Sequence, residues 1–478
     1  MDKKHRNRRD RNKTVSFSKA MSYLLRHGAH KEGLTISDDG YVFLAELMEH
    51  KSIKSKHPSL QDVLRVVNSN DKKRFEIKTD PPSEEVTLEN CYIRAAQGHT
   101  ISGIEEEKLL EKIVFPYNYP SILHGTYEKV LALIQEGGLS KMERNHIHFA
   151  KGYAGDKKVI SGMRQSCEIF IEVNLPKMVK DDISVYESSN GVILTSGIDG
   201  MLPPKYFRKI LNKNKELIYS APFDYIVVFD FECTCDDNKD TKFNVQEIIE
   251  FPAVIIDVKN KCFLKGFQTY VKPSEHPVLS EFCTELTGIT QEQVDAGVSI
   301  ETAVAMFHNF LARNNVLGSE FILMSCGDFD GKALKKEAEY KDFFVPSYLK
   351  EWINIKKAFP LHLYKEEFKQ ETVINVRTTK GVVRGMPDML EACSLELLGR
   401  HHSGIDDSVN IARCALEAIH NGHTFTHNYI DGTKYETGFD KTDTFKETLA
   451  ELESQEAAKE IDIEDHLLMM QEYTDNNE

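Results

Sequence analysis

One stretch of the chain, residues 225–232 (YIVVFDFE), constrains its fold more than any other. Its β-branched and aromatic residues predict a buried strand, and two carboxylates, Asp230 and Glu232, interrupt the end of that strand. Side chains two residues apart on a strand point to the same face, so we expect both acids on one side, about 7 Å apart along the chain. Because burial strengthens their repulsion, a cation such as Mg²⁺ is expected between them. Two solvated acids are the alternative, since Asp-x-Glu alone is common.

Two later stretches carry further acids and a histidine. Residues 326–330 (CGDFD) follow an apolar run and end in Asp330. Residues 399–414 (GRHHSGIDDSVNIARC) contain His402 five residues before Asp407, at an expected helix start. Two metal ions about 3.5–4 Å apart, held by several carboxylates, can clamp the attacking and the leaving oxygen of a phosphodiester. A histidine nearby can deprotonate the attacking water, because its unperturbed pKa lies near neutrality.

These motifs, together with residues 277–297 (PVLSEFCTELTGITQEQVDAG), resemble the DEDDh 3′→5′ exonucleases. The resemblance is greatest to the exoribonucleases that trim histone mRNA, small RNA and ribosomal RNA ends. It covers residues 223–428 and implies an RNase H-like α/β domain that uses two Mg²⁺ ions, or Mn²⁺, to shorten RNA 3′ ends. The implied general base is His402, and the implied metal ligands are Asp230, Glu232, Asp330 and Asp407.

Two of these assignments have rivals in the sequence. His401 and Asp406 have the same spacing as His402 and Asp407; the later pair agrees better with the His-x-Gly-x-Asp-Asp pattern of the family. Asp328 similarly lies two residues before Asp330.

Length and composition set wider limits. A chain of 478 residues predicts two or three domains. The net charge of −15 is unevenly spread: residues 441–478 hold twelve acids and three lysines, whereas residues 1–13 are strongly basic. Nine scattered cysteines without metal-ligand spacing favour free thiols in a reducing compartment. No apolar run reaches about 18 residues, so we expect an intracellular protein, in the cytoplasm or nucleus, with no membrane contact.

The first half of the chain begins with a helical pattern. Residues 16–27 (SFSKAMSYLLRH) have apolar residues at helical spacing, a serine cap and Gly28 as a stop signal. Arg26 and His27 lie in its last turn, where the helix dipole alone can account for them. From residue 93 onward, short strand-like runs alternate with glycine and histidine. Any single histidine there is either a nucleotide or metal ligand or, more commonly, part of an ordinary turn.

Taken in order, the motifs LLRHG, NDKKRF, QGH, LHGT, MERNHIHFA and SGMR closely resemble the tRNA splicing 2′-phosphotransferase family over residues 16–211. The resemblance implies a winged-helix-like RNA-binding lobe followed by an ADP-ribosyltransferase-like lobe that binds NAD⁺. The implied catalytic set is Arg26, His27, Arg74 and Arg164; Arg94 is a rival for the third place, but the family pattern selects Arg74. The implied NAD⁺-binding residues are His124, Gly125, Thr126, Asn145, His146 and His148.

The implied reaction removes an internal 2′-phosphate from RNA, as at a tRNA splice junction. The phosphate attacks the ribose C1″ of NAD⁺ and expels nicotinamide. The adjacent ribose hydroxyl then attacks phosphorus, which leaves 2′-OH RNA and ADP-ribose 1″,2″-cyclic phosphate. Guanidinium groups suit this phosphate because they stay charged and grip its oxygens bidentately.

The sequence thus predicts a multi-domain α/β (α+β) chain and a bifunctional RNA-processing enzyme. Two alternatives remain: an ADP-ribosyltransferase acting on RNA 5′-phosphate ends or on protein beside the nuclease, or a non-catalytic RNA-binding scaffold. For the tail, a solvated helix over residues 442–459 is favoured over competition with RNA for a basic groove. The expected order is a basic disordered tail (1–15), a winged-helix-like lobe (16–90), an NAD⁺-binding lobe (91–211), a linker (212–222), an exonuclease domain (223–428) and an acidic, partly helical tail (429–478).

Overall fold

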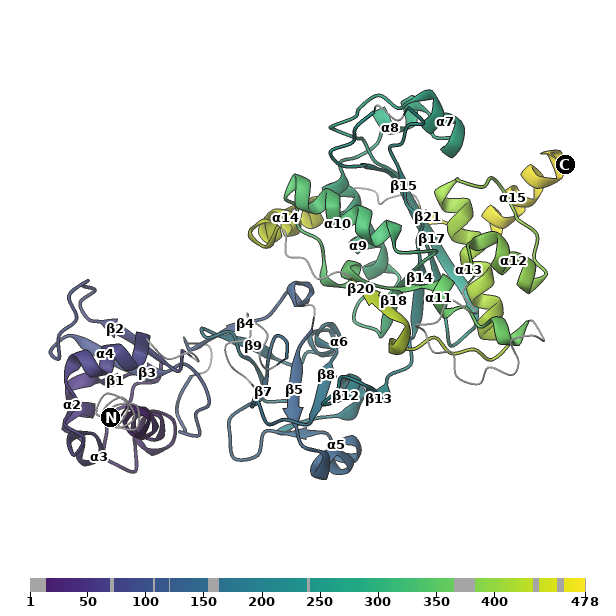
Figure 1. Ribbon diagram of the computed structural model, residues 1–478. Coiled ribbons are helices and arrows are strands. Elements are labelled where there is room, and N and C mark those ends of the chain that lie inside the picture. The colour runs from purple at the N-terminus through teal and green to yellow at the C-terminus, as the bar shows by residue number, and fades with distance from the viewer. Residues whose placement is uncertain are drawn as a thin grey trace, which may run out of the picture. The chain divides into compact units, whose positions relative to one another are not determined.

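Figure 1 shows the computed structural model, in which two compact units, Met1–Tyr219 and Ser220–Glu478, follow one another along the chain. Each unit buries hydrophobic clusters of its own, as expected of a chain too long for one core. The prediction of a mixed α/β chain is confirmed. The residues that the structure describes are 14–68, 73–105, 108–119, 121–153, 163–238, 241–364, 383–432, 438–453 and 460–477.

The first unit begins with helices beside a three-stranded antiparallel sheet of order β1-β3-β2. Of the expected basic tail, residues 1–13 lie outside the described residues, and residues 14–23 are helical, which extends the expected helix. That helix continues as a π-helical turn, η1 (Leu24–Gly28), and a Cβ on Gly28 would lie 2.8 Å from the Tyr23 ring. The remaining elements are β1 (Val42–Phe43), α2 (Leu44–Glu49), α3 (Lys51–Lys54), α4 (Leu60–Asn68), β2 (Phe75–Thr79) and β3 (Cys91–Ala95). The winged-helix assignment of this lobe stays a prediction.

The rest of the first unit is built on two four-stranded sheets, of order β4-β9-β10-β7 and β13-β12-β8-β5. The second sheet has β8 as a central strand, whose five residues are all buried, including Glu172, which pairs with Arg208 at 3.1 Å. The strands are β4 (Leu110–Lys112), β5 (Leu123–Thr126), β6 (Leu139–Ser140), β7 (Ile147–Phe149), β8 (Ile169–Val173), β9 (Val185–Ser188), β10 (Ile193–Thr195), β11 (Met201–Leu202), β12 (Phe207–Asn212) and β13 (Leu217–Ser220), with helices α5 (Leu131–Gly137) and α6 (Leu175–Lys180).

The stretch expected as a linker, residues 212–222, is largely part of this sheet instead. Strand β12 extends to its first residue, and β13 pairs with β12. Lys215 lies in the left-handed region (φ 65°), which closes a tight turn in which its N–H donates to the carbonyl of Asn212 at 2.9 Å. The polar composition that suggested a linker belongs to an exposed edge hairpin.

The second unit is organised around one sheet of order β20-β19-β18-β14-β16-β17-β21, with β15 pairing off this path to β16. The three strands β14, β18 and β19 are parallel, and β16 and β17 are antiparallel to their neighbours. The strands are β14 (Tyr225–Val228), β15 (Glu232–Cys233), β16 (Ile248–Asp257), β17 (Cys262–Tyr270), β18 (Phe321–Ser325), β19 (Glu351–Asn354), β20 (Ile430–Gly432) and β21 (Glu460–Ile461).

The strand expected over residues 225–232 is interrupted. Strand β14 ends at Val228, and pairing resumes in β15 at Glu232. Between them the N–H of Phe231 donates to Oδ1 of Asp330 at 2.9 Å. The Asp330 side chain thus accepts the hydrogen bond that a neighbouring strand would otherwise accept. The break is part of the acidic site described in the next subsection.

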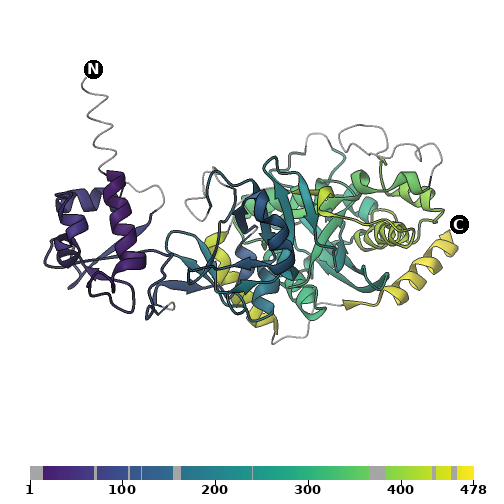
Figure 2. The same cartoon turned by 90° about the horizontal axis from the view of Figure 1, so that it is seen from below.

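Helices cover both faces of this sheet. Figure 1 shows α13 on one side and α9 on the other, and the 90° view of Figure 2 shows the same chain from below. None of the described helices combines the length and the apolar composition needed to cross a membrane. The helices are α7 (Glu281–Thr287), α8 (Gln291–Asp295), α9 (Ile300–Arg313), α10 (Phe329–Lys341), α11 (Ile355–Ala358), α12 (Met386–Cys393), α13 (Gly404–His420), α14 (Thr442–Glu453) and α15 (Ile463–Asn477).

The acidic tail is packed rather than solvated in its described parts. Helix α14 packs on α9, and Phe445 is buried against the rings of Phe344 and His308. Residues 454–459, which we expected to continue this helix, lie outside the described residues. The expectation of a solvated helix was wrong because its single apolar stripe has a partner in α9.

A buried carboxylate anchors the loop that leads to α7. Glu247 accepts the backbone N–H groups of Ser274, Glu275 and His276, and it pairs with Lys341 at 2.8 Å. Burial opposes ionisation, but the Lys341 hydrogen bond and these N–H donors together lower the pKa of Glu247 to about 2. The stability that this charge contributes is therefore present above the ordinary glutamate pKa and lost as pH falls toward 2.

We expect Glu247→Gln to destabilise the second unit by about 2–3 kcal/mol near neutral pH, because charge-assisted hydrogen bonds are lost. Urea unfolding at several pH values measures this, and the difference from wild type should shrink as pH falls below about 4.5. The exposed Glu339→Gln serves as a control. A constant difference down to pH 3 would contradict the assignment.

Candidate functional site

Acidic side chains from three elements meet at the end of β14. Oxygen atoms of Asp230, Glu232 and Asp407 lie within 4.8 Å of one another. Asp407 comes from the first turn of α13, and Asp330 comes from the first turn of α10 and bonds the backbone between the first two acids. The four acids assigned as metal ligands therefore lie together, while their roles stay predictions.

Burial raises the pKa values of all four acids, and repulsion by neighbouring carboxylates adds to this for Asp230, Glu232 and Asp407. Burial, followed by the charges of Asp330 and Asp407, raises the pKa of Asp230 well above its ordinary value. Burial and the charge of Glu250 raise the pKa of Glu232 to about 9. Burial likewise raises the pKa of Asp330 to about 6 and that of Asp407 to about 7.

These residues suit a divalent cation. Oδ1 of Asp407 is buried and has no hydrogen-bond partner among the residues that the structure describes, and several carboxylates lie within 4.8 Å of one another. Such an oxygen is costly to bury unless a cation or a donor reaches it. Hard cations such as Mg²⁺ favour all-oxygen ligand sets of this kind.

A fifth acid, Glu250, was missed from the sequence. It lies on β16 opposite Glu232 and is buried, where it accepts the N–H groups of Gly404 and Ile405 at 3.1 and 3.2 Å. These N–H groups belong to the first turn of α13, where helices favour negative charge. The available signal was a single acid inside the apolar run of residues 248–256.

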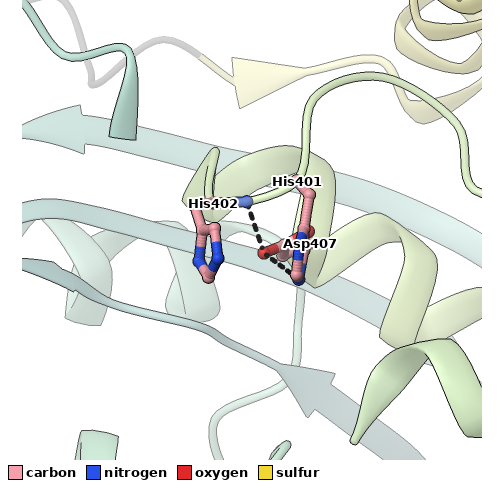
Figure 3. A group of neighbouring side chains, drawn as sticks. All are labelled: His401, His402 and Asp407. Carbon is pink, nitrogen blue, oxygen red and sulfur yellow. Dashed lines mark hydrogen bonds and ion pairs between the residues drawn. The ribbon is translucent and has the colours of Figure 1, made fainter. Parts of the chain in front are cut away.

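The two histidines both lie beside Asp407. Figure 3 shows the backbone N–H of His402 donating to Oδ2 of Asp407 at 3.0 Å, with Nε2 of His401 3.9 Å from the same oxygen. The two imidazole rings stack at 4.0 Å, and both residues are exposed. Asp407 therefore interacts with the loop that carries the predicted base, His402, and with its rival.

The two rival acids lie outside the cluster. Asp406 accepts the N–H of Arg400 and pairs with Nε2 of His466, both at 2.9 Å. Asp328 bonds Nδ2 of Asn354 at 2.9 Å and Nζ of Lys357 at 3.1 Å. Neither acid belongs to the group formed by Asp230, Glu232 and Asp407.

A cationic group occupies the first unit. Burial, followed by the charges of Arg74 and Arg144, lowers the pKa of Arg26 to about 10. Nε and Nη2 of Arg26 are buried and have no hydrogen-bond partner in the described part of the chain, which suits an anionic ligand. His27 follows in the same turn, where its Nδ1 lies 3.0 Å from Oγ1 of Thr100.

Arg144 is a cation that the sequence assignment missed, although it lies within the MERNHIHFA motif. Besides its effect on Arg26, its charge adds to burial in lowering the pKa values of His27, His124 and His148. It therefore lies among the predicted phosphate-binding and NAD⁺-binding residues.

The predicted NAD⁺-binding residues lie on β5 and β7 and in the turn before β7. Nδ1 of His124 is 3.0 Å from the carbonyl oxygen of His148, and Nε2 of His148 is 2.7 Å from Oε1 of Gln97. Gly98 separates Arg26 from His148, since a Cβ there would lie 3.7 Å from both side chains. Asn145 and His146 line a small cavity with this Gln97–Gly98 turn, while Gly125 and Thr126 continue β5 beyond His124.

Arg164 has a different environment from the other predicted arginines. It is exposed, and its described partner is the hydroxyl of Tyr127, whose pKa is lowered by hydrogen bonds from Ser166 and then Arg164. Residues 154–162, just before it, lie outside the described residues. The structure thus joins Arg26 electrostatically with Arg74, while Arg164 lies beside Tyr127. Arg94, the rival of Arg74, is paired with Glu76 at 2.7 Å.

Two family models match the two halves of the chain. The RNA 2′-phosphotransferase family (Tpt1/KptA) matches residues 12–197, and an exonuclease family matches residues 227–415. The tRNA 2′-phosphotransferase 1 of Danio rerio is 42% identical over 205 residues, which are 42% of this chain and 88% of that protein. The human protein of the same name is also 42% identical over 205 residues, 42% of this chain and 78% of its own length.

The second half is similar to exoribonucleases. ERI1 exoribonuclease 2 of Xenopus laevis is 35% identical over 217 residues, which are 42% of this chain but only 29% of that protein. A solved nuclease domain of 3′hExo, a DEDDh family member bound to rAMP, is 32% identical and matches 44% of this chain and 98% of its own length, with a TM-score of 0.37. The chain belongs to the tRNA 2′-phosphotransferase family, and its C-terminal half carries an exonuclease domain.

Proposed function

We propose that this chain removes internal 2′-phosphates from RNA at the Arg26 site and shortens RNA 3′ ends at the acidic site. The observation that carries the proposal is the opposite charge of two buried groups. Among the described residues, Arg26 in the first unit has buried donors without a hydrogen-bond partner and lies near other arginines, while the second unit has clustered carboxylates and a buried acceptor on Asp407 without one. A phosphate is bound directly by the first kind of site. The second kind binds phosphate through divalent cations.

In the first unit, Arg26 and Arg74 would bind the 2′-phosphate, and Arg144 adds positive charge to the same site. When bound, NAD⁺ supplies the C1″ carbon that accepts the phosphate oxygen as nicotinamide leaves. His124 and His148 would hold this co-substrate together with Gly125, Thr126, Asn145 and His146. The guanidinium groups stabilise the charge that develops on phosphate in the transition state.

His27 and Arg164 would act at the edges of this site. The hydrogen bond between Nδ1 of His27 and Thr100 fixes the imidazole, so His27 is suited to position the phosphate or to protonate it rather than to act as a nucleophile. Arg164 is the third proposed phosphate-binding arginine. Its side chain hydrogen-bonds the hydroxyl of Tyr127.

In the second unit, Asp230, Glu232, Asp330 and Asp407 would hold two divalent ions. Bound ions of this kind stabilise the attacking and the leaving oxygen of a phosphodiester. His402 would accept the proton of the attacking water, and its backbone bond to Asp407 fixes its distance from the acids. The exposed imidazole is open to an RNA end.

We expect Arg26→Lys to lower the rate of nicotinamide release from NAD⁺ in the presence of 2′-phosphorylated RNA by roughly 10²–10³-fold. Lysine keeps the positive charge but lacks the planar guanidinium group that binds two phosphate oxygens at once. Exonuclease rates should not change. The control is Arg65→Lys, an exposed arginine on α4. Unchanged nicotinamide release by the Arg26 variant would exclude this site.

We expect Asp230→Asn to abolish shortening of RNA from its 3′ end while phosphate transfer continues at the wild-type rate. The reason is that the amide cannot replace a charged metal ligand. Gel analysis of end-labelled RNA measures shortening. Asp328→Asn is the matched control, since that acid lies outside the cluster; equal losses in both variants would contradict the assignment.

We expect Asp407→Asn to raise the unfolding temperature of the second unit in EDTA by roughly 2–6 °C, because one charge of a repelling set is removed. Added Mg²⁺ should stabilise wild type and have much less effect on the variant. Thermal unfolding with and without Mg²⁺ tests both statements. A variant that melts lower than wild type in EDTA would show that the carboxylates do not repel one another.

A further inference from the structure

We propose that residues 460–477, the C-terminal strap, position the loop that carries His402. The strap consists of β21 and α15, and it follows the region matched by the exonuclease family, which ends at residue 415. This inference rests on the exonuclease function proposed above. It gives the strap a role in supporting the active-site loop of the second unit, whereas a free acidic tail would have none.

The strap is anchored to the central sheet by its first residues. Strand β21 pairs with β17, with Ile461 opposite Gly266, and Lys265 pairs with Asp462 at 3.0 Å. A Cβ on Gly266 would lie 2.6 Å from Cδ1 of Ile463, so this position leaves room for the strap and for no side chain of its own. Ile461 and Ile463 are buried in the main hydrophobic cluster of the unit. The start of α15 is therefore fixed independently of the active-site loop.

From this anchor α15 runs beside α13 and contacts the backbone just before the histidines (Figure 1). The N–H of Gly399 donates to Oγ1 of Thr474 at 3.0 Å and lies 3.3 Å from the carbonyl oxygen of Met470. Gly399 lies in the left-handed region (φ 68°), and a Cβ there would be 3.1 Å from Cγ of Met470. The glycine thus permits a backbone-level contact between the loop and α15.

A second link joins the strap to the other side of the loop through Asp406. Its Oδ1 pairs with Nε2 of His466 at 2.9 Å, while its Oδ2 accepts the N–H of Arg400 at 2.9 Å. Asp406 is the residue before Asp407 in the first turn of α13. The strap therefore holds the chain on both sides of the two histidines.

These contacts matter because little else restrains the His402 ring. The residue is exposed and lies in the left-handed region (φ 66°), and the interaction found for it beyond ring stacking is its backbone N–H to Asp407. The place of the imidazole is thus set by the backbone of the loop. A displacement of a catalytic group by about 1 Å can cost roughly 100-fold in rate.

Single substitutions in the full chain test the two links separately. His466→Leu removes the donor to Asp406, and His466→Gln can restore it because the amide also donates. Thr474→Val removes the side-chain acceptor for the N–H of Gly399 at nearly constant shape and leaves the Met470 carbonyl in place. The control is Met469→Gln, on the same helix but 58% exposed.

We expect His466→Leu and Thr474→Val to lower kcat for RNA 3′-end shortening by about 10–100-fold, as losses of supporting contacts do. KM should stay within about twofold, because the RNA-binding surface is unchanged. His466→Gln should recover most of the rate, and Met469→Gln should match wild type.

Three outcomes would overturn the inference or its basis. If wild type shortens RNA and both strap variants keep its kcat, the strap does not position the loop, and the exonuclease proposal stands. If kcat falls only in proportion to the unfolded fraction measured by thermal unfolding, and Gln does not rescue, the strap is merely structural. If wild type itself shortens no RNA with Mg²⁺, the exonuclease proposal fails instead.

Discussion

The second unit depends on holding several carboxylates beside one another in partly or fully buried positions. Four backbone N–H groups make this possible by donating hydrogen bonds: Phe231 to Asp330, His402 to Asp407, and both Gly404 and Ile405 to Glu250. Such donors favour the charged form of an acid, but burial and mutual repulsion still raise the pKa values of the cluster. Bound divalent cations would offset this repulsion between the carboxylates.

The first unit also holds like charges close together, but these charges are positive. Arg26 lies near Arg74 and Arg144, and the pKa of its guanidinium is lowered by burial and by these two charges. Two of its nitrogen atoms have no hydrogen-bond partner among the described residues. An anion is the ligand that would satisfy them, so the two proposed activities differ in how phosphate would be bound: by direct contact in the first unit and through metal ions in the second.

Local sequence pattern predicted the parts of these sites that lie close together in the chain. Asp230 and Glu232 lie close together as expected, although the strand on which that expectation rested is broken between Val228 and Glu232. The helix start at Gly404 brings Asp407 toward them. The pattern could not reveal that Asp330 would bond Phe231, since 99 residues separate them. It also missed Glu250 and Arg144, because a lone charge in a strand or a loop gains its role only from distant partners. The packing of α14 was missed for the same reason, because the sequence around Phe445 does not reveal its contacts on α9.

The central claim is that one chain carries two independent phosphate-handling sites. Intact-mass analysis of an RNA bearing one internal 2′-phosphate, incubated with NAD⁺ and Mg²⁺ and with each omitted in turn, tests it most directly. Without NAD⁺, the account predicts RNA that is shortened at its 3′ end but keeps its phosphate. Without Mg²⁺, it predicts full-length RNA that has lost one phosphate. Loss of both mass changes on either omission would contradict independence, and no mass change in the complete mixture would contradict the claim itself.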